Sequence, residues 1–161
     1  MKQREIRIMF EEFSGIDELP EEMKVLVMEA RRVSVLAWSP YSGFCVGAAV
    51  RLASGEIITG NNQENAAYPS GLCAERTALF YANANYPDIP VEAIAISAKN
   101  AGGKVREPVK PCGSCRQVML ETEARFKHPI RIILDGQQSI FSFEGIDTLL
   151  PMSFRPASLK G

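Results

Sequence analysis

The sequence has 161 residues, enough for one domain that buries roughly two thirds of the surface of its unfolded chain. Hydrophobic residues make up 46% and charged residues 23%, close to the globular average, which excludes disordered and fibrous proteins. Lysine and arginine total 18 against 19 for aspartate and glutamate, without a long block of either sign, so the charge pattern of a nucleic-acid-binding protein is missing.

Charged residues recur through the N-terminal sequence, unlike in a signal peptide, and no apolar run approaches the ~20 residues that span a bilayer. We therefore expect a soluble cytoplasmic protein without a membrane partner. In that reducing compartment the four cysteines are expected to be free thiols or metal ligands rather than disulfide partners. They are Cys45, Cys73, Cys112 and Cys115.

Apolar spacing predicts the elements of the first half of the chain. Alternation over residues 6–10 predicts a short edge strand, which forms an N-terminal strand-like extension. Apolar residues at helical spacing predict a helix over residues 20–37. Two strand-like runs, over 45–53 and 56–59, flank a tight connection and predict a β-hairpin.

The second half alternates between helical and strand patterns. We expect, in order, an Asn- and Gly-rich loop over 60–71, a helix over 73–84, a strand over 91–98, a polar loop over 99–110, a helix over 111–125 and a strand over 130–134. This alternation is typical of an α/β fold, in which helices cover a sheet and neighbouring strands are usually parallel.

Three cysteines have a spacing typical of a zinc site. Cys112 and Cys115 have the two-residue gap that lets both sulfurs reach one tetrahedral ion. Cys73 and Cys112 each stand at the start of a predicted helix, where partial positive charge favours thiolates. Three ligands without an obvious fourth are typical of a catalytic site, in which water takes the vacant position.

Charged residues beside these cysteines are suited to the same chemistry. Glu75 stands two residues after Cys73, a suitable place for a general acid and base next to a metal-bound water. Three thiolates carry more negative charge than a zinc ion neutralises. We therefore expect Arg76 and Arg116 to compensate this charge by donating hydrogen bonds to the sulfurs.

Each of these features also has a simpler interpretation. A Cys-x-x-Cys pair occurs in redox dithiols and in structural zinc sites, where His128 or Cys45 would supply a fourth ligand. An acidic residue such as Glu75 in the first turn of a helix stabilises the helix dipole in any protein. A non-enzymatic domain stabilised by a structural zinc ion is therefore the alternative to an enzyme.

Taken together, the motifs match a known signature. Cys73-Ala74-Glu75 followed by Pro111-Cys112-Gly113-Ser114-Cys115 is the zinc-deaminase signature of enzymes that act on bases. Over residues 22–155 the chain resembles the small nucleoside cytidine deaminases. The blocks that carry this resemblance are residues 40–44, 46–49, 64–68, 73–77, 111–117, 149–151 and Phe154.

The resemblance implies a single three-layer α/β/α domain over residues 1–161, with a core over 22–155 and a mixed five-stranded sheet. It also implies one zinc ion per chain, held by Cys73, Cys112 and Cys115. Zinc-bound hydroxide would convert cytidine and deoxycytidine to uridine and deoxyuridine with release of ammonia, in pyrimidine salvage, and Glu75 would move the protons.

The resemblance further assigns a nucleoside-binding role to six residues and implies a homotetramer. Phe44 would pack on the nucleoside, Asn62 and Glu64 would bind ribose hydroxyls, the Ala74 backbone would contact the base, and Tyr68 and Phe154 would contribute across subunit interfaces. A deaminase of another cytosine nucleoside, such as a nucleoside antibiotic, is the alternative substrate class. Enzymes that edit tRNA or DNA are disfavoured by the near-neutral charge and by a cysteine at position 73, where they usually have histidine.

Overall fold

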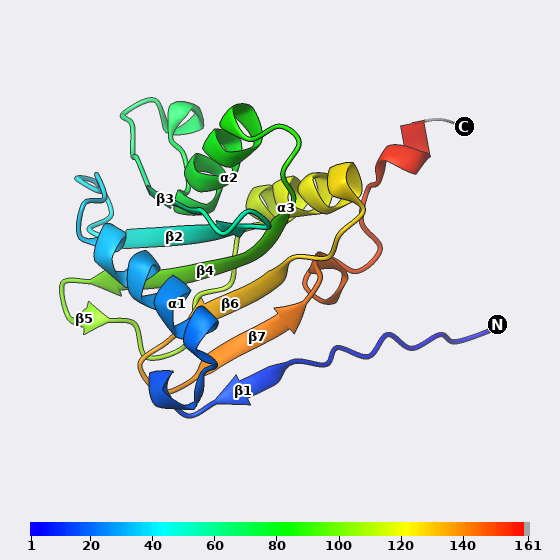
Figure 1. The fold of residues 1–161 in the computed structure, drawn as a ribbon, viewed down its shortest axis with the longest axis horizontal. Helices are drawn as coiled ribbons and strands as arrows, with labels where there is room; N and C mark the ends of the chain where they lie inside the picture. The colour runs from blue at the N-terminus through cyan, green and yellow to red at the C-terminus, as the bar shows by residue number, and fades with distance from the viewer. Residues whose placement is uncertain (160–161) are drawn as a thin grey trace.

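A computed structural model describes residues 1–159 (Figure 1), so residues 160–161 of the expected domain lie outside the described part. The helices and strands are, in chain order, β1 (Glu11–Phe13), α1 (Glu21–Ser34), β2 (Cys45–Leu52), β3 (Ile57–Asn61), α2 (Ala74–Asn85), β4 (Val91–Asn100), β5 (Gly103–Lys104), α3 (Gly113–Phe126), β6 (Arg131–Asp135) and β7 (Ile140–Glu144). Within the described range, no helix is long and apolar enough to cross a membrane.

Within residues 1–159, seven strands form one sheet, in the order β1-β7-β6-β4-β2-β3, with β5 attached to β4. The expected number of five strands is therefore too low, because β5 and β7 were not predicted. Among the described strands, only β4 and β6 are parallel neighbours, which confirms a mixed sheet, although the alternation of elements alone suggested mostly parallel strands. Short turns such as those between β2 and β3 and between β6 and β7 require antiparallel pairing, whereas α3 provides the longer crossover from β4 to β6.

The sheet lies between two helical layers, which confirms the three-layer α/β/α architecture (Figure 1). α1 packs on one face, and α2 and α3 lie together on the other. The central strand β4 is buried on both faces: Ile94 and Ile96 contribute to the core beneath α2 and α3, while Ala93 and Ala95 face the core beneath α1.

The N-terminal strand-like extension differs from the expected one. The edge strand is β1, over Glu11–Phe13, and residues 6–10 are outside any strand. β1 pairs with β7 so that Glu11 lies opposite Ser142, and this register would place residue 8 opposite residue 145, beyond the end of β7. Residues 6–8 therefore have no strand to pair with, whereas the ring of Phe10 packs on Phe141 at 4.9 Å between centroids.

Candidate metal centre and active site

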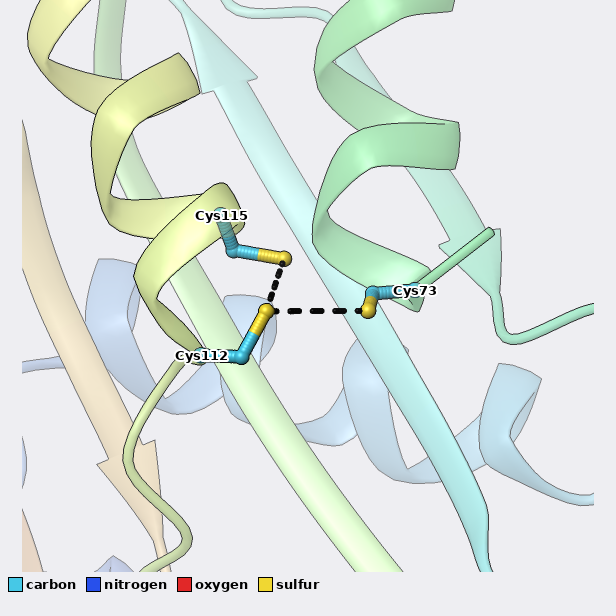
Figure 2. Close-up of side chains that lie close together, drawn as sticks. All are labelled: Cys73, Cys112 and Cys115. Atoms are coloured by element: carbon cyan, nitrogen blue, oxygen red, sulfur yellow. Dashed lines mark hydrogen bonds between the residues drawn. The ribbon is translucent and has the colours of Figure 1, made fainter. Parts of the chain in front are cut away.

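The three motif cysteines come together where α2 and α3 begin (Figure 2). Cys73 is the N-cap residue of α2, Cys112 is the N-cap residue of α3, and Cys115 is completely buried in the first turn of α3. The Sγ atoms of Cys73 and Cys112 are 3.9 Å apart, those of Cys112 and Cys115 are 3.5 Å apart, and all three lie within 4.8 Å of one another.

The geometry of this sulfur group fits a zinc ion. Tetrahedral zinc with bonds of about 2.3 Å to sulfur places its sulfur ligands about 3.8 Å apart, close to the separations found here. Within residues 1–159, no fourth side chain of a metal-binding type joins the group. Cys45 lies at the start of β2 with its sulfur 3.1 Å from the Ser39 hydroxyl, and His128 follows the far end of α3. The site therefore has the three-ligand set of a catalytic zinc centre rather than a closed structural one.

Hydrogen bonds between the thiols separate their pKa values. The pKa of Cys73 is lowered to about 5, because the neighbouring Cys115 thiol stabilises its thiolate and the Arg76 guanidinium donates a hydrogen bond to its sulfur. The pKa of Cys115 is raised, because the neighbouring Cys73 thiolate favours its protonated form and because the thiol is buried. A metal ion must displace this proton when it binds the group.

Glu75 lies directly beside the sulfur group, in the first turn of α2. Its side chain is 5% exposed, although a carboxyl group ordinarily stays in water. Burial raises the pKa of Glu75 above the usual carboxyl range, and the nearby Cys73 thiolate raises it further. A raised pKa makes the carboxylate of Glu75 a stronger base, which suits a group that takes up a proton and returns it.

The two arginines of the motifs have different partners. The Arg76 guanidinium donates to the Cys73 sulfur at 3.7 Å, and its buried Nε has no hydrogen-bond partner among the described residues. The Arg116 guanidinium instead donates to two backbone carbonyls, those of Pro111 at 2.7 Å and Leu149 at 2.5 Å. Its described contacts therefore fix the chain around α3, which differs from the expected hydrogen bond to sulfur.

A pocket of about 540 Å³ opens beside the cysteines. Of the residues expected to bind the nucleoside, five line it, together with Cys73, Cys112, Glu75 and Arg76: they are Phe44, Asn62, Glu64, Tyr68 and Ala74. Phe154 is not among the described lining residues. It is 60% exposed in the C-terminal segment, where its backbone carbonyl accepts a hydrogen bond from Gln117.

Asn62 and Glu64 shape one side of the pocket through hydrogen bonds to the start of β2 and to the chain that precedes it. The Asn62 amide accepts from the Val46 nitrogen at 2.7 Å and donates to the Phe44 carbonyl at 2.9 Å. The Glu64 carboxylate accepts from the Tyr41 nitrogen at 2.9 Å and from the Ser42 hydroxyl. The Ser42 hydroxyl lowers the pKa of Glu64, so this carboxylate is ionised at neutral pH.

The pocket also contains residues that the sequence analysis did not assign to it. Tyr41, Ile96, Val109 and Lys110 all belong to its lining. Val109 and Lys110 lie in the polar loop expected over 99–110, and their only signal in the sequence is that they directly precede the Pro111 motif.

A three-cysteine zinc centre, a buried carboxyl group beside it and an adjoining pocket define a zinc-dependent hydrolase of the deaminase class. Residues 20–127 match the family described as the cytidine and deoxycytidylate deaminase zinc-binding region. The chain therefore belongs to this family.

Individual relatives agree with this assignment. The chain is 44% identical over 98 residues to a cytidine deaminase from Halalkalibacterium halodurans, covering 61% of this chain and 70% of that protein. It is 41% identical over 100 residues to a cytidine deaminase from Sporosarcina psychrophila, covering 62% of this chain and 69% of that protein.

Solved structures show the same fold. The crystal structure of cytidine deaminase from Burkholderia pseudomallei superposes with a TM-score of 0.69 at 37% identity, covering 81% of this chain and 97% of that one. That of the Mycobacterium tuberculosis enzyme superposes with a TM-score of 0.64 at 30% identity, covering 83% and 97%. The relatives are thus matched over most of their length.

Proposed function

We propose that this protein hydrolyses cytidine and deoxycytidine to uridine and deoxyuridine with release of ammonia, and so acts in pyrimidine salvage. The observation that carries the proposal is the burial of Glu75 beside three cysteines in one pocket. The relatives named cytidine deaminases support the choice of substrate.

One zinc ion per chain would be held by Cys73, Cys112 and Cys115. When bound there, it would polarise a water molecule and lower the pKa of that water, so that the water attacks at neutral pH. The remaining chemistry falls to the side chains and backbone of the chain itself.

Glu75 would move the protons of the reaction. Its buried carboxylate takes a proton from the attacking water, passes it to the ring of the pyrimidine, and then helps the amino group to leave as ammonia. The raised pKa of Glu75 suits these steps, because the proton is held strongly enough to be taken and weakly enough to be returned. Glu75 is therefore the catalytic acid and base of the proposal.

The nucleoside would be held by the five expected residues of the lining. The Ala74 backbone amide is in the first turn of α2, where N–H groups have no partner within the helix and can donate to a base. The ionised Glu64 and the Asn62 amide suit hydroxyl groups of a ribose, and the half-buried ring of Phe44 suits the apolar side of the nucleoside. Arg76 would balance the charge of the thiolates.

We further infer that residues 1–161 act as one catalytic domain and that four copies assemble. Tyr68 and Phe154 are 76% and 60% exposed, as expected for side chains that contribute to neighbouring subunits. A cytoplasmic location follows from the three ligand cysteines, which need a reducing compartment to remain thiolates.

The test is uridine and ammonia formation from cytidine by the zinc-loaded protein, beside Glu75→Gln and the control Glu121→Gln. Glu121 is an exposed carboxylate of α3, so its substitution should leave turnover unchanged. We expect Glu75→Gln to keep one zinc per chain and to lose turnover by about 10²-fold to 10⁴-fold. Equal turnover in Glu75→Gln would refute the role of Glu75. A zinc-loaded wild-type protein inactive on cytidine, deoxycytidine and other cytosine nucleosides would instead support a structural zinc site.

A further inference from the structure

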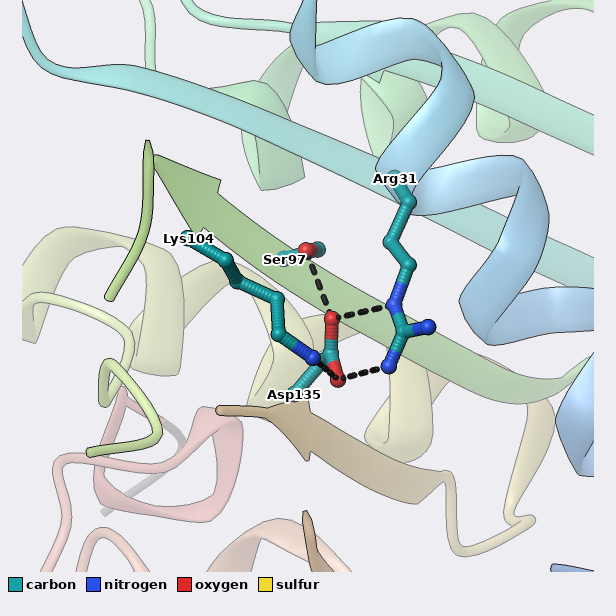
Figure 3. Close-up of polar contacts among 4 residues, drawn as sticks. All are labelled: Arg31, Ser97, Lys104 and Asp135. Carbon is teal, nitrogen blue, oxygen red and sulfur yellow. Dashed lines mark hydrogen bonds and ion pairs between the residues drawn. The ribbon is translucent and has the colours of Figure 1, made fainter. Parts of the chain in front are cut away.

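An ion cluster around a buried carboxylate lies on the face of the sheet that α1 covers (Figure 3). Asp135, the last residue of β6, has no exposed surface. Its carboxylate accepts hydrogen bonds from the Arg31 guanidinium at 2.7 and 2.8 Å, from the Ser97 hydroxyl at 2.8 Å and from the Lys104 ammonium at 3.2 Å. Ile96 lines the pocket, so the adjacent Ser97 and its partners lie on the opposite face of the sheet.

Lys104 connects this cluster to the pocket. It belongs to β5, which has two residues and pairs only with the end of β4 within the described chain. Two paired residues give a strand little stability of its own. The position of β5 therefore depends on the ion pair between Lys104 and the buried Asp135.

The chain after β5 is held by the turn that follows Asp135. The Gln137 nitrogen donates to the Val105 carbonyl at 2.9 Å, and the Gln138 nitrogen donates to the Arg106 carbonyl at 3.1 Å. The end of β6 and its turn thus fix the connection between β5 and α3 by backbone hydrogen bonds as well as by the ion pair.

Gly136 in the same turn touches this connection directly. A Cβ atom at Gly136 would lie 2.7 Å from the Pro108 nitrogen and 2.9 Å from the Arg106 carbonyl oxygen, closer than such atoms can approach. Pro108 is itself buried. The turn and the connection are therefore in tight contact, and a displacement of one must displace the other.

The next residues of the connection form part of the pocket wall. Val109 and Lys110 line the pocket, and Pro111 and Cys112 follow them into α3. The Pro111 carbonyl accepts a hydrogen bond from Arg116 at 2.7 Å, so α3 fixes this end of the connection separately. The wall thus lies between two anchors, one at the end of β6 and one on α3.

We propose that Asp135 is a positioning residue for substrate binding, which sets the place of Val109 and Lys110 through Lys104 and the connection between β5 and α3. The proposal rests on the proposed deaminase function. α3 independently holds the end of the connection that is nearest the cysteines. Loss of the contact with the end of β6 therefore displaces Val109 and Lys110 more than it displaces the cysteines or Glu75. The expected effect is a raised KM with kcat little changed.

Two variants test this anchor in different ways. Lys104→Met removes one charge but leaves Asp135 paired with Arg31, and Gly136→Ala pushes on the connection without touching the ion pairs. For both we expect the KM for cytidine to rise about threefold to tenfold, with kcat within about twofold of wild type and one zinc per chain. Substitution of Asp135 itself would leave two cations unpaired and is a poorer test.

Two controls separate positioning from a general loss of stability. At Gly15 an added Cβ meets nothing within 4 Å, so Gly15→Ala should match wild type. Met23 is buried in the core beneath α1, so Met23→Ala should lower stability without changing KM.

Hydrogen exchange of residues 104–111, followed by mass spectrometry, gives a measurement that needs no turnover. We expect faster exchange in Lys104→Met and in Gly136→Ala, but not in Met23→Ala. Unchanged KM and unchanged exchange in both test variants would overturn the proposal. If the two test variants exchange faster but the wild-type protein does not deaminate cytidine, the result supports the positioning role of Asp135 and counts against the proposed function.

Discussion

The tight packing of β3 against α2 makes Gly60→Ala a direct test of how the site is positioned. An added Cβ at Gly60 would lie 2.6 Å from the Ala78 nitrogen and 2.8 Å from the Ala74 carbonyl oxygen. Ordinary contacts begin near 3.4 Å, so α2 must move by about 0.6 to 0.8 Å, because backbone atoms cannot rotate away. The movement falls on the first turn of α2, which carries Glu75 and follows Cys73.

Two measurable losses follow from this movement. Overpacking of this kind costs about 1–3 kcal/mol of unfolding free energy, and each kcal/mol lowers the Tm of a domain of this size by roughly 2–4 °C. Displacing Glu75 and Cys73 by a fraction of an ångström should lower kcat by roughly tenfold to 10²-fold. Urea titration measures the first loss, and cytidine turnover measures the second well below the Tm.

Gly47→Ala is the matched control, because Gly47 packs β2 against α1 rather than α2. Its added Cβ would lie 2.1 Å from the Ala30 carbonyl oxygen, so it should cost at least as much stability. None of the proposed site residues belongs to α1, so kcat should stay near wild type. If Gly47→Ala does not fold, Met23→Ala provides the stability control. Wild-type kcat in Gly60→Ala, or an equal loss of kcat in the control, would refute the reasoning.

Four further predictions concern the metal site and the N-terminal segment. Cys115→Ala should lose zinc by elemental analysis, because it removes a buried ligand, whereas Cys45→Ala should keep one zinc per chain. Zinc affinity, measured by chelator competition, should fall from about pH 8 to about pH 6, because the raised pKa of Cys115 retains a proton that zinc must displace. Arg76→Gln should weaken zinc binding, because the Cys73 thiolate loses the guanidinium that stabilises it. The same variant should shift the acid limb of the pH–rate profile to higher pH, because uncompensated thiolate charge would make a zinc-bound water less acidic. Phe10→Ala should lower the unfolding free energy by about 1 kcal/mol in urea titration, because it removes ring stacking on β7, and should leave kcat unchanged.

Each of these predictions has a contrary outcome. Full zinc content in Cys115→Ala would contradict the three-cysteine ligand set, and pH-independent affinity would contradict the shared proton. An unchanged pH–rate profile in Arg76→Gln would remove Arg76 from the charge balance of the site. Wild-type stability in Phe10→Ala would mean that the N-terminal segment contributes nothing to the sheet.

Patterns within single segments of the sequence predicted the larger elements, because the spacing of apolar residues along a segment depends only on that segment. Apolar spacing predicted the three helices, and the observed α1, α2 and α3 lie within or near the expected ranges. Strand pairing depends on a distant partner, which explains the errors. Residues 6–10 alternate as a strand does, but residues 6–8 extend past the end of β7, and β7 itself is a short segment that the sequence analysis did not predict.

The sequence by itself determined the chemistry of the site, because residue type and motif spacing fix which atoms can bind zinc and carry a proton. Cys73, Cys112, Cys115 and Glu75 were all recognisable in this way. Only the tertiary structure decided what surrounds them. It turned Arg116 towards backbone carbonyls, placed Phe154 outside the described pocket lining, and brought Lys110 into the wall.

The ion cluster around Asp135 shows the physical reason for this division. Its four residues come from α1, β4, β5 and β6, and no local periodicity relates them. They meet because the order of strands in the sheet, and the face to which each side chain points, are set by contacts between segments far apart in the chain. Short-range patterns determine what each segment can do, and the packed sheet determines which segments act together.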